Sequence, residues 1–539
     1  MNPLTFTVPN TSPIPNPNPD PATRLVPIPA AMPVLLLTDA FIFLLLGLLL
    51  AYGFHAARHE HLRAPWRRVV ASRVGQVSLV VLGAYATLGL LDSVHFHPRL
   101  ESFSEPGMAT TTATTDQGPA TMTAAEGQAP AVSTDAEGTT PASPLVKPAA
   151  AGGEGASTVT AGQPAHPGEV TYSPEVLSLL DLWLAPLRDS QEKTYSAPFA
   201  THLQAMETLR LADGSSQRGY PRLRHGGAHL VDPAADRGPD IALTLLAGMG
   251  KGLILWGLVV MLLARALPWR HWRAGFLTLG LILVLGWGIA DLAVKYHVLG
   301  TDKVGEDVLY QALKSIRTGL VIGTLTTLVM LPAALLLGIM AGYFRGLTDD
   351  VIQYLYTTLN SIPGVLLIAA AVLMLQVHMA NHEAEYASLA QRADLRLFYL
   401  CLILGVTSWT GLCRLLRGEA LKLREADYVQ AAQALGVGHL AILGRHILPN
   451  VMHLVVITLA LDFSGLVLAE AVLSYINIGV DPTMNSWGNM INGARLELAR
   501  EPVVWWSLTG ALVFMFVLVL FANLLADVVR DAFDPRLQD

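Results

Sequence analysis

The segment between two long apolar runs reads READYVQAAQALGVGHLAILGRHILPN, residues 424–450. Four of its residues recur at i, i+3, i+4 and i+7, the spacing that places them on one stripe of a helix: Tyr428, Ala431, Ala432 and Leu435. Gly436 suits the left-handed conformation that ends a helix, and Pro449 suits the first turn of the next one. The sequence therefore predicts a short amphipathic helix whose small-residue face fits the groove of a partner.

Long apolar runs dominate the rest of the chain, and each is close to the ~20 residues that a helix needs to cross a bilayer. We identify nine of them, at about 33–53, 75–92, 241–264, 274–296, 317–343, 351–377, 397–416, 451–477 and 504–528. Of the 539 residues, 52% are hydrophobic and only 14% are charged, whereas a soluble domain carries about 25% charged residues. These features predict an all-α integral membrane protein with nine spans.

Composition also excludes several classes of function. The net charge of −7 argues against a basic nucleic-acid-binding face. The two cysteines, Cys401 and Cys413, lie in one apolar segment, which excludes a disulfide framework and a cysteine-based zinc site. No GxxxxGK[ST] loop occurs, so the chain does not bind nucleotide by that device. We therefore expect no catalytic residues, no metal site and no cofactor bound by this chain.

Basic residues gather in alternate connections between the runs. They are Arg58, Arg63, Arg67, Arg68 and Arg73 in the first such loop, Arg265, Arg270 and Arg273 in the second, and Arg417, Lys422, Arg424 and Arg445 in the third. Lys and Arg in short loops favour the cytoplasmic side of a membrane. This pattern predicts an N-terminus outside, nine crossings and a cytoplasmic C-terminus.

Two long segments then face outward. Residues 1–32 are rich in Pro and Asn, and we expect them to be disordered. A hairpin of two spans at 33–94 separates them from a low-complexity linker at 95–170. Residues 171–240 contain more leucine and aromatic side chains, which predicts a small extracytoplasmic segment, either a packed cap or a membrane-surface helix. A second hairpin at 241–296 leads into the last part of the chain, 297–539.

Five motifs follow one another in that last part. They are Leu299-Gly-Thr-Asp302-x2-Gly305-x-Asp307-Val308, Ala431-Ala432-x3-Gly436-x10-Ile447-Leu448-Pro449, Arg445-His-Ile-Leu-Pro-Asn450, Ser486-Trp487-Gly488 and Arg530-Asp531-Ala532-x-Asp534-Pro535-Arg536. The second resembles the EAA loop of ABC importer permeases of the type I import fold. The others resemble segments of the C-type subunit of the dipeptide/oligopeptide/nickel permeases. Gln430 stands where that loop has its Glu, and Glu306 replaces an Arg of the first motif.

The resemblance covers about 274–539 and implies a permease core of about five to six spans, with about four additional N-terminal spans. It also implies partners: a second, B-type permease, two cytoplasmic ATPases that bind the ATP, and an extracytoplasmic substrate-binding protein. The location implied is the plasma (bacterial inner) membrane. The residues that would couple to the ATPases are Asp427, Tyr428, Ala431, Ala432, Leu435, Gly436 and Pro449. A weaker similarity links 194–198 and 226–230 to the outward insertion of oligopeptide permeases.

Charged residues inside the apolar runs suggest further sites, because a charge in a bilayer is costly unless it is paired or wetted. Lys251 and Asp291 could form an intramembrane pair, and the alternatives are a snorkelling lysine or a flexible glycine kink around it. Asp462 and Glu470 could lie on a translocation path, or they could pack against the partner permease. His378 and His382 are spaced as metal ligands on a helix would be, but histidines in an outer loop are usually solvated. We treat His95 and His97 in the same way.

Three functions stay open at this point. The first is the permease subunit of an ATP-driven importer of di- or oligopeptides, or of nickel or another small solute. The second is a membrane scaffold or sensor built on a permease-like core. The third is a secondary transporter, which would need intramembrane acids as a proton relay, and only Asp462 and Glu470 are available for that role.

Overall fold

The computed structural model describes residues 32–100, 171–172, 175–210, 215–263, 271–382 and 388–533. Several predictions lie outside these residues: the disordered segment before Met32, most of the 95–170 linker, two basic residues of the second loop (Arg265 and Arg270), and the last three residues of the final motif (Asp534, Pro535 and Arg536). The chain divides into one large unit, 1–98 with 173–539, and a small unit, 99–172. In the small unit, β3 (Arg99–Leu100) pairs antiparallel with β4 (Thr171–Tyr172).

Nine helices or helical runs within the described ranges are long and apolar enough to cross a membrane, which agrees with the nine predicted spans. They are α1 (Leu37–Arg58), α3 (Arg73–Asp92), α6 (Pro233–Leu263), α7 (Arg273–Ala293), α8 (Val308–Phe344), α10 (Gly364–Asn381), α11 (Leu389–Ser408) with α12 (Thr410–Arg424), the run His439–Tyr475, and α17 (Trp506–Phe533). The predicted all-α membrane class is confirmed.

The sixth predicted span is wrong in one respect, because it is not a single helix. The run expected at 351–377 is divided between α9 (Leu347–Ser361) and α10, with a break at Ile362 and Pro363. A residue before proline is pushed away from helical geometry, and Ile362 has φ −92° and ψ 131°. The residues just before the break, Thr357-Thr-Leu-Asn-Ser361, are mostly polar, so together with Pro363 and Gly364 they are a local signal for it that the prediction did not use.

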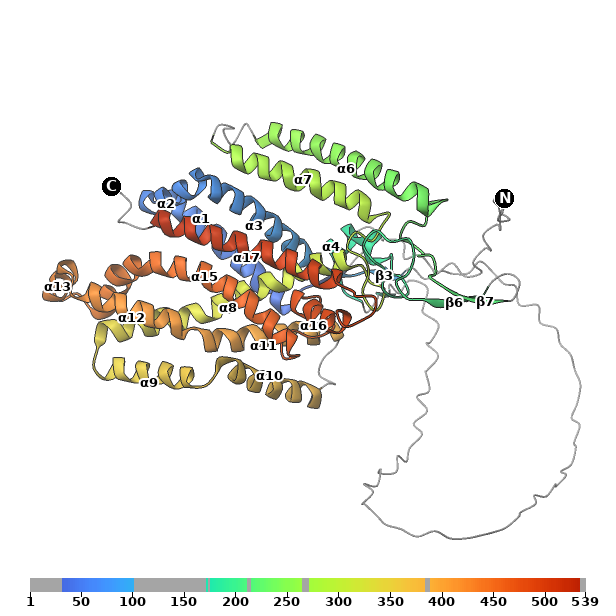
Figure 1. Ribbon diagram of the computed structural model, residues 1–539. Coiled ribbons are helices and arrows are strands. Elements are labelled where there is room, and N and C mark those ends of the chain that lie inside the picture. The colour runs from blue at the N-terminus through green and yellow to red at the C-terminus, as the bar shows by residue number, and fades with distance from the viewer. Residues whose placement is uncertain are drawn as a thin grey trace, which may run out of the picture. The chain divides into compact units, whose positions relative to one another are not determined.

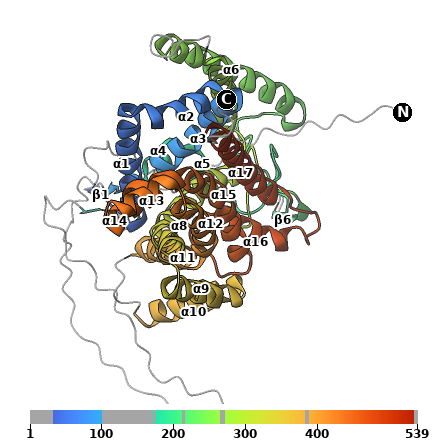
Figure 2. The same cartoon turned by 90° about the vertical axis from the view of Figure 1, so that its left-hand side faces the viewer.

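The third span also differs from its prediction, since α6 begins at Pro233 rather than near 241. Its first two turns carry Asp236 and Asp240, so hydropathy detects only the part that follows them. α6 and α7 form a close hairpin, in which a Cβ at Gly252 would lie 2.6 Å from the backbone oxygen of Leu283. The hairpin lies at one edge of the helices, with α9 and α10 at the opposite edge (Figure 2).

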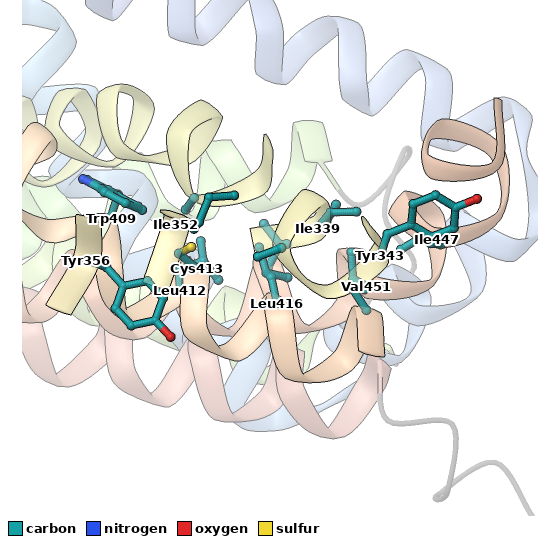
Figure 3. Packing of buried hydrophobic residues seen from close by; sticks show 14 of the residues in the cluster. Ile339, Tyr343, Ile352, Tyr356, Trp409, Leu412, Cys413, Leu416, Ile447 and Val451 are labelled. Atoms are coloured by element: carbon teal, nitrogen blue, oxygen red, sulfur yellow. The ribbon is translucent and has the colours of Figure 1, made fainter. Parts of the chain in front are cut away.

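α8 lies at the centre of the helices and is the most buried of the spans that consist of a single helix (Figure 2). It approaches α12 closely, because a Cβ at Gly338 would lie 2.8 Å from the backbone oxygen of Cys413 and one at Gly342 would lie 2.6 Å from that of Arg417. These contacts join the core whose packing is drawn in Figure 3. Glycines on α8 are therefore needed for the helices to meet.

The remaining helices connect or cap the spans. α2 (Glu60–Ala71) joins α1 to α3, and its Val69 packs with Val529 and Ala532 of α17. α16 (Trp487–Glu497) begins at the Ser-Trp-Gly motif and places Trp487 against α8, where its Nε1 donates a hydrogen bond to the backbone oxygen of Ala312 at 3.1 Å. The motif thus has a packing role inside this chain.

The described residues between 175 and 232, together with β1 (Met32–Val34) and β2 (His95–His97), fold against the ends of the spans. β1, β2 and β5 (Leu177–Ser178) form a three-stranded antiparallel sheet, in that order. Two short helices follow, α4 (Leu179–Trp183) and α5 (Ala185–Arg188), and then the hairpin of β6 (Glu207–Arg210) and β7 (Ser216–Gly219). β6 and β7 lie at one end of the helices, and α13 (Asp427–Ala434) lies at the other (Figure 1).

Candidate functional site

The predicted amphipathic helix is present as α13, which projects beyond the ends of α12 and α15 (Leu448–Tyr475) (Figure 1). α12 ends at Arg424, and the backbone turns at Ala426, which has φ −70° and ψ 141°. Asp427 lies in the first turn of α13, where its negative charge interacts favourably with the helix dipole and stabilises the helix. α13 is therefore a separate helix with its own start signal.

Gly436 ends this helix in the way that its sequence predicts. Its φ is +75°, its N–H donates to the backbone oxygen of Gln433 at 3.0 Å, and the N–H of Val437 donates to that of Ala432 at 3.0 Å. These two bonds form a Schellman motif, which satisfies carbonyl groups that a helix end leaves free. A Cβ at Gly436 would meet no atom within 4 Å, so backbone conformation and not space selects glycine here.

The apolar residues of α13 are divided between two faces, which corrects the predicted single stripe. Ala432 is only 7% exposed and packs, with Val429, against the core that contains Tyr343. Tyr428 and Leu435 are 43% and 83% exposed, and the Tyr428 hydroxyl accepts a hydrogen bond from Asn450 Nδ2 at 3.2 Å. The spacing i, i+3, i+4 and i+7 spans a wide arc of a helix, and only the tertiary packing decides which part of it is covered.

The support for α13 is apolar at its base and polar at its rim. Figure 3 shows Ile339, Tyr343, Ile447 and Val451 gathered at one end of the buried cluster. The hydroxyl of Tyr343 is within hydrogen-bond distance of His439 Nδ1, at 2.8 Å. It also accepts a hydrogen bond from the Gln433 side chain at 3.3 Å. Motion of α13 would therefore be transmitted to α8 through Tyr343.

A second rim contact joins α9 to α12. Arg417 donates two hydrogen bonds to the carboxylate of Asp349, at 2.6 and 2.7 Å. Hydrogen bonding from Arg417 is the largest cause that lowers the pKa of Asp349 from its usual value. A bidentate pair of this kind fixes orientation as well as distance.

Pro449 is the second residue of α15, so it lies in the first turn of that helix as predicted, although the helical run of this span begins earlier. The helical run starts at His439 with α14 (His439–Ile442), continues through a π-helical segment at Leu443–Ile447, and passes into α15. The N–H of Leu448 donates to the backbone oxygen of Leu443, an i to i−5 bond. Proline lacks an N–H and its ring crowds the preceding turn, so the wider π turn accommodates Pro449 inside a continuous run.

The structure brings together the two residues of the predicted intramembrane pair. Lys251 Nζ lies 2.7 Å from Asp291 Oδ2, and the Lys251 side chain is 59% exposed while that of Asp291 is 22% exposed. Lys251 lies near the middle of its span and Asp291 near the end of α7, so the lysine side chain extends toward the end of the hairpin that carries the 175–232 segment. Lys251 therefore forms the predicted pair with Asp291 and also extends its side chain toward the end of the span, so both alternatives hold at once.

Asp462 and Glu470 are not equivalent. Glu470 is buried and accepts a hydrogen bond from Ser474 Oγ at 2.7 Å, and its Oε1 would lie 2.8 Å from a Cβ at Gly488 of α16. Asp462 is half-buried, and no partner for its carboxylate occurs within the described ranges. The position of Glu470 favours a role in joining α15 to α16 over a role on a path.

One cluster of buried charges is missed by the sequence analysis. Arg317 of α8 donates to Asp39 Oδ1 of α1 from Nη2 at 2.6 Å and to Thr38 Oγ1 at 2.8 Å, and its Nη2 lies 3.5 Å from Asp394 Oδ1. His95, expected to be solvated, is instead buried, with its Nδ1 2.7 Å from Asp39 Oδ2. The available signal was that these charges all lie at the outer ends of their predicted runs.

A second cluster lies one turn earlier on α8. Lys314 Nζ donates to Asp92 Oδ1 at 2.7 Å and to Asp181 Oδ2 at 2.9 Å, and Tyr310 also donates to Asp181 at 2.8 Å. Burial opposes the charge of Asp181, but Lys314 and the N–H of Ser178 outweigh it and lower its pKa. The two clusters fasten the added segments to α8.

The first motif forms a turn that holds the 175–232 segment in place. His297 Nδ1 lies 2.7 Å from Asp307 Oδ2, and its Nε2 lies 3.6 Å from Glu192 Oε1. Burial acts to lower the pKa of His297, but the hydrogen bond to Asp307 and the nearby negative charge of Glu192 outweigh it and raise that pKa to about 9. Glu192 also accepts hydrogen bonds from backbone N–H groups of 224–226, and despite its burial its pKa falls to about 2.

The other histidines give no sign of a metal site. His382 Nδ1 lies 2.9 Å from the backbone oxygen of His378, and the two rings lie 4.3 Å apart. Across the residues that the structure describes, no group of three or more His, Cys, Asp or Glu side chains is arranged to hold a metal ion.

Comparison with known proteins links this architecture to membrane transport components. The family described as "Binding-protein-dependent transport system inner membrane component" matches residues 334–539. The chain is 32% identical over 242 residues to the Glutathione transport system permease protein GsiD of Pectobacterium atrosepticum, which covers 45% of this chain and 73% of that protein. It is 28% identical over 241 residues to the Oligopeptide transport system permease protein OppC of Haemophilus influenzae, with 45% and 71% covered.

Proposed function

This chain belongs to the family of binding-protein-dependent transport system inner membrane components, and we propose that it is the permease subunit of an ATP-driven importer of peptides. The relatives that support this are named as glutathione, oligopeptide and dipeptide transport permeases. The nine candidate spans support a multi-pass membrane protein. The chain would form part of the path that the peptide follows across the membrane, and its helices would move to open that path. Partner ATPases would hydrolyse the ATP.

The observation that carries the proposal is the exposed face of α13. Tyr428, Ala431 and Leu435 are exposed at the far end of the helices from the 175–232 segment, on a helix held by a glycine turn. An exposed leucine on a projecting helix favours a protein partner with an apolar groove. We assign that partner to the ATPase subunits, with one ATPase receiving α13 and the other receiving the equivalent helix of a B-type permease.

This assignment also orients the chain. The α13 end, the basic loop at α2 and the last described residues of α17 would be cytoplasmic, and the 175–232 segment would face an extracytoplasmic binding protein. ATP binding would move α13, and the contacts of Tyr343 with His439 and Gln433 would pass that motion to α8. The spans would then alternate between outward-open and inward-open states.

A pull-down tests the proposal. The tagged chain is extracted in mild detergent from its native membrane, and the co-purifying proteins are identified by mass spectrometry. We expect a second permease and ATPase subunits with the native chain, and loss of the ATPases with Leu435→Asp. Leu347→Asp, at an exposed leucine that begins α9 at the same end of the helices, is the matched control and keeps them.

Uptake measurements complete the test. Peptide uptake that requires ATP and persists when the proton gradient is collapsed would agree with the proposal. Uptake that follows the proton gradient would instead support a secondary transporter, and absence of ATPases from the native complex would support a scaffold.

A further inference from the structure

α2 connects two membrane spans and is too short to be a span itself. At 1.5 Å per residue its 12 residues extend about 18 Å, whereas the hydrocarbon of a bilayer is ~30 Å thick. Only His59 separates α2 from α1, only Ser72 separates it from α3, and both of these residues have extended backbone. Because each end of α2 is joined directly to the end of a span, the helix is held at one surface of the membrane.

One side of α2 packs against α17, near the last described residues of the chain (Figure 1). Val69 is fully buried and lies in one cluster with Val529. The ring of Trp66 lies edge-on to that of Phe533, with 5.7 Å between the ring centres, and its Nε1 donates to the hydroxyl of Tyr52 at 3.4 Å. These contacts fix the rotation of α2 about its own axis, and so decide which of its residues face away from α17.

The residues that face away from α17 are mostly basic. Arg63, Arg67 and Arg68 are exposed, and Arg73 is exposed at the start of α3. Arg63 and Arg67 are separated by four positions, which places them one above the other on the helix. Glu60 is the one acid among the twelve residues of α2. We call Arg63, Arg67, Arg68 and Arg73 the α2 arginine face.

The α2 arginine face has no protein counter-charge. In the part of the chain that the structure describes, none of its four guanidinium groups forms an ion pair with a carboxylate. Arginines elsewhere in the chain do form such pairs, among them Arg317, Arg345, Arg396 and Arg417. Several positive charges at one membrane surface without a partner indicate that an anion from outside the chain meets them.

The position of the face favours lipid as the source of that anion. A guanidinium group matches the geometry of a phosphate, and anionic lipids attract basic segments that lie beside the membrane. An acidic protein surface would match the charge as well. α13, however, projects beyond the ends of the helices, whereas both ends of α2 are tied to spans and keep it at the level of the lipid head groups (Figure 1).

We propose that the α2 arginine face binds the phosphodiester head groups of anionic phospholipids. The inference goes beyond the proposed function and holds whatever solute the complex transports. Bound lipid would fasten the first two added spans to the membrane surface, and Val69 would extend that support to α17.

Native mass spectrometry of the full chain in a neutral detergent tests the proposal. The chain is titrated with phosphatidylglycerol and with phosphatidylcholine of the same acyl chains. We expect phosphatidylglycerol to bind more tightly, and Arg63→Gln with Arg67→Gln to weaken its binding at least about fivefold while leaving phosphatidylcholine unchanged. Added salt should reduce the preference of the native chain, because exposed charges are screened.

A matched variant removes the same charge elsewhere. Arg218→Gln with Arg224→Gln alters two exposed arginines of the 175–232 segment, and we expect it to keep the native affinity for phosphatidylglycerol. Equal weakening by both double variants, or native affinity in the α2 variant, would overturn the proposal. Thermal unfolding of both variants reports whether they fold.

Two further results would assign the face to another ligand. Displacement of phosphatidylglycerol by the same concentration of inorganic phosphate would point to a soluble anion. Loss of a co-purifying protein from the α2 variant, with phosphatidylglycerol binding intact, would point to an acidic protein surface. Either result would refute the lipid assignment and leave the importer proposal standing, because that proposal depends on α13.

Discussion

The guanidinium of Arg317 in α8 donates to the carboxylate of Asp39 in α1, with 2.6 Å between Nη2 and Oδ1. The two residues are 278 positions apart, and both are buried. This bond joins the first added span directly to the central helix of the permease core. The added spans are therefore fastened to the core by charge pairs as well as by apolar packing.

Removal of one partner of this pair should be costly. Asp39→Ala leaves a buried guanidinium without its main carboxylate, and we expect a loss of roughly 3–5 kcal/mol in unfolding free energy. Thermal unfolding in detergent, with Arg317→Met and the double variant, gives the coupling energy. Asp350→Ala, at an exposed carboxylate of α9, is the control and should change little. Additive effects of the two single substitutions would contradict the pairing.

The His297 pair predicts a pH dependence. Its pKa is raised to about 9 from an ordinary value near 6.5, so the protonated ring stabilises the fold fully below about pH 6.5 and this contribution is lost as the pH rises through 9. A difference of this size corresponds to at most about 3 kcal/mol. We expect the unfolding temperature to fall between pH 7 and pH 10, and to fall much less in His297→Gln. Identical profiles would refute the prediction.

Gly436 should tolerate residues in the order of their left-handed propensity. Asparagine adopts this conformation at modest cost, alanine costs about 1 kcal/mol and valine costs more, and space is open for all of them. We therefore expect peptide uptake to decrease from Gly436→Asn to Gly436→Ala to Gly436→Val. Gly436→Asp should leave membrane insertion intact and abolish uptake, because it places a charge beside the docking face. Normal uptake by Gly436→Asp would count against the coupling assignment.

The Lys251–Asp291 pair should show rescue. Asp291→Asn leaves a lysine charge within the membrane hairpin without its partner, which destabilises the chain. Adding Lys251→Met should restore the unfolding temperature, because no charge then remains. A double variant as unstable as Asp291→Asn alone would show that the bond contributes nothing.

Glu470 and Asp462 should respond differently to loss of charge. Glu470→Gln keeps the hydrogen bond from Ser474, whereas Glu470→Ala leaves a buried hydroxyl and a void, which costs about 1–3 kcal/mol. Asp462→Asn should leave unfolding unchanged, because no bond to the carboxylate is present in the described chain. Peptide uptake with an altered KM in Glu470→Gln, at unchanged stability, would instead support a place on the path.

Local signals in the sequence were sufficient to predict many features of the fold. The number of spans follows from runs of apolar residues, and the glycine turn after α13 follows from one residue whose backbone preference is strong. The Pro363 break was also locally encoded, by the polar residues at 357–361 and by Pro363 itself, although the prediction of a single span at 351–377 passed over it. Pro449 lies in the first turn of α15 as predicted, but the π-helical segment that joins α15 to α14 was not foreseen.

The sequence by itself determined the all-α membrane class, the nine spans, the alternation of basic loops and the existence of α13, because hydropathy and turn preferences act over a few neighbouring residues. The tertiary structure alone decided that Ala432 is buried while Leu435 is exposed, and that Asp39 meets Arg317. Such pairings depend on how distant helices pack. One helix can meet several partners with the same hydropathy, and only the packed arrangement selects among them.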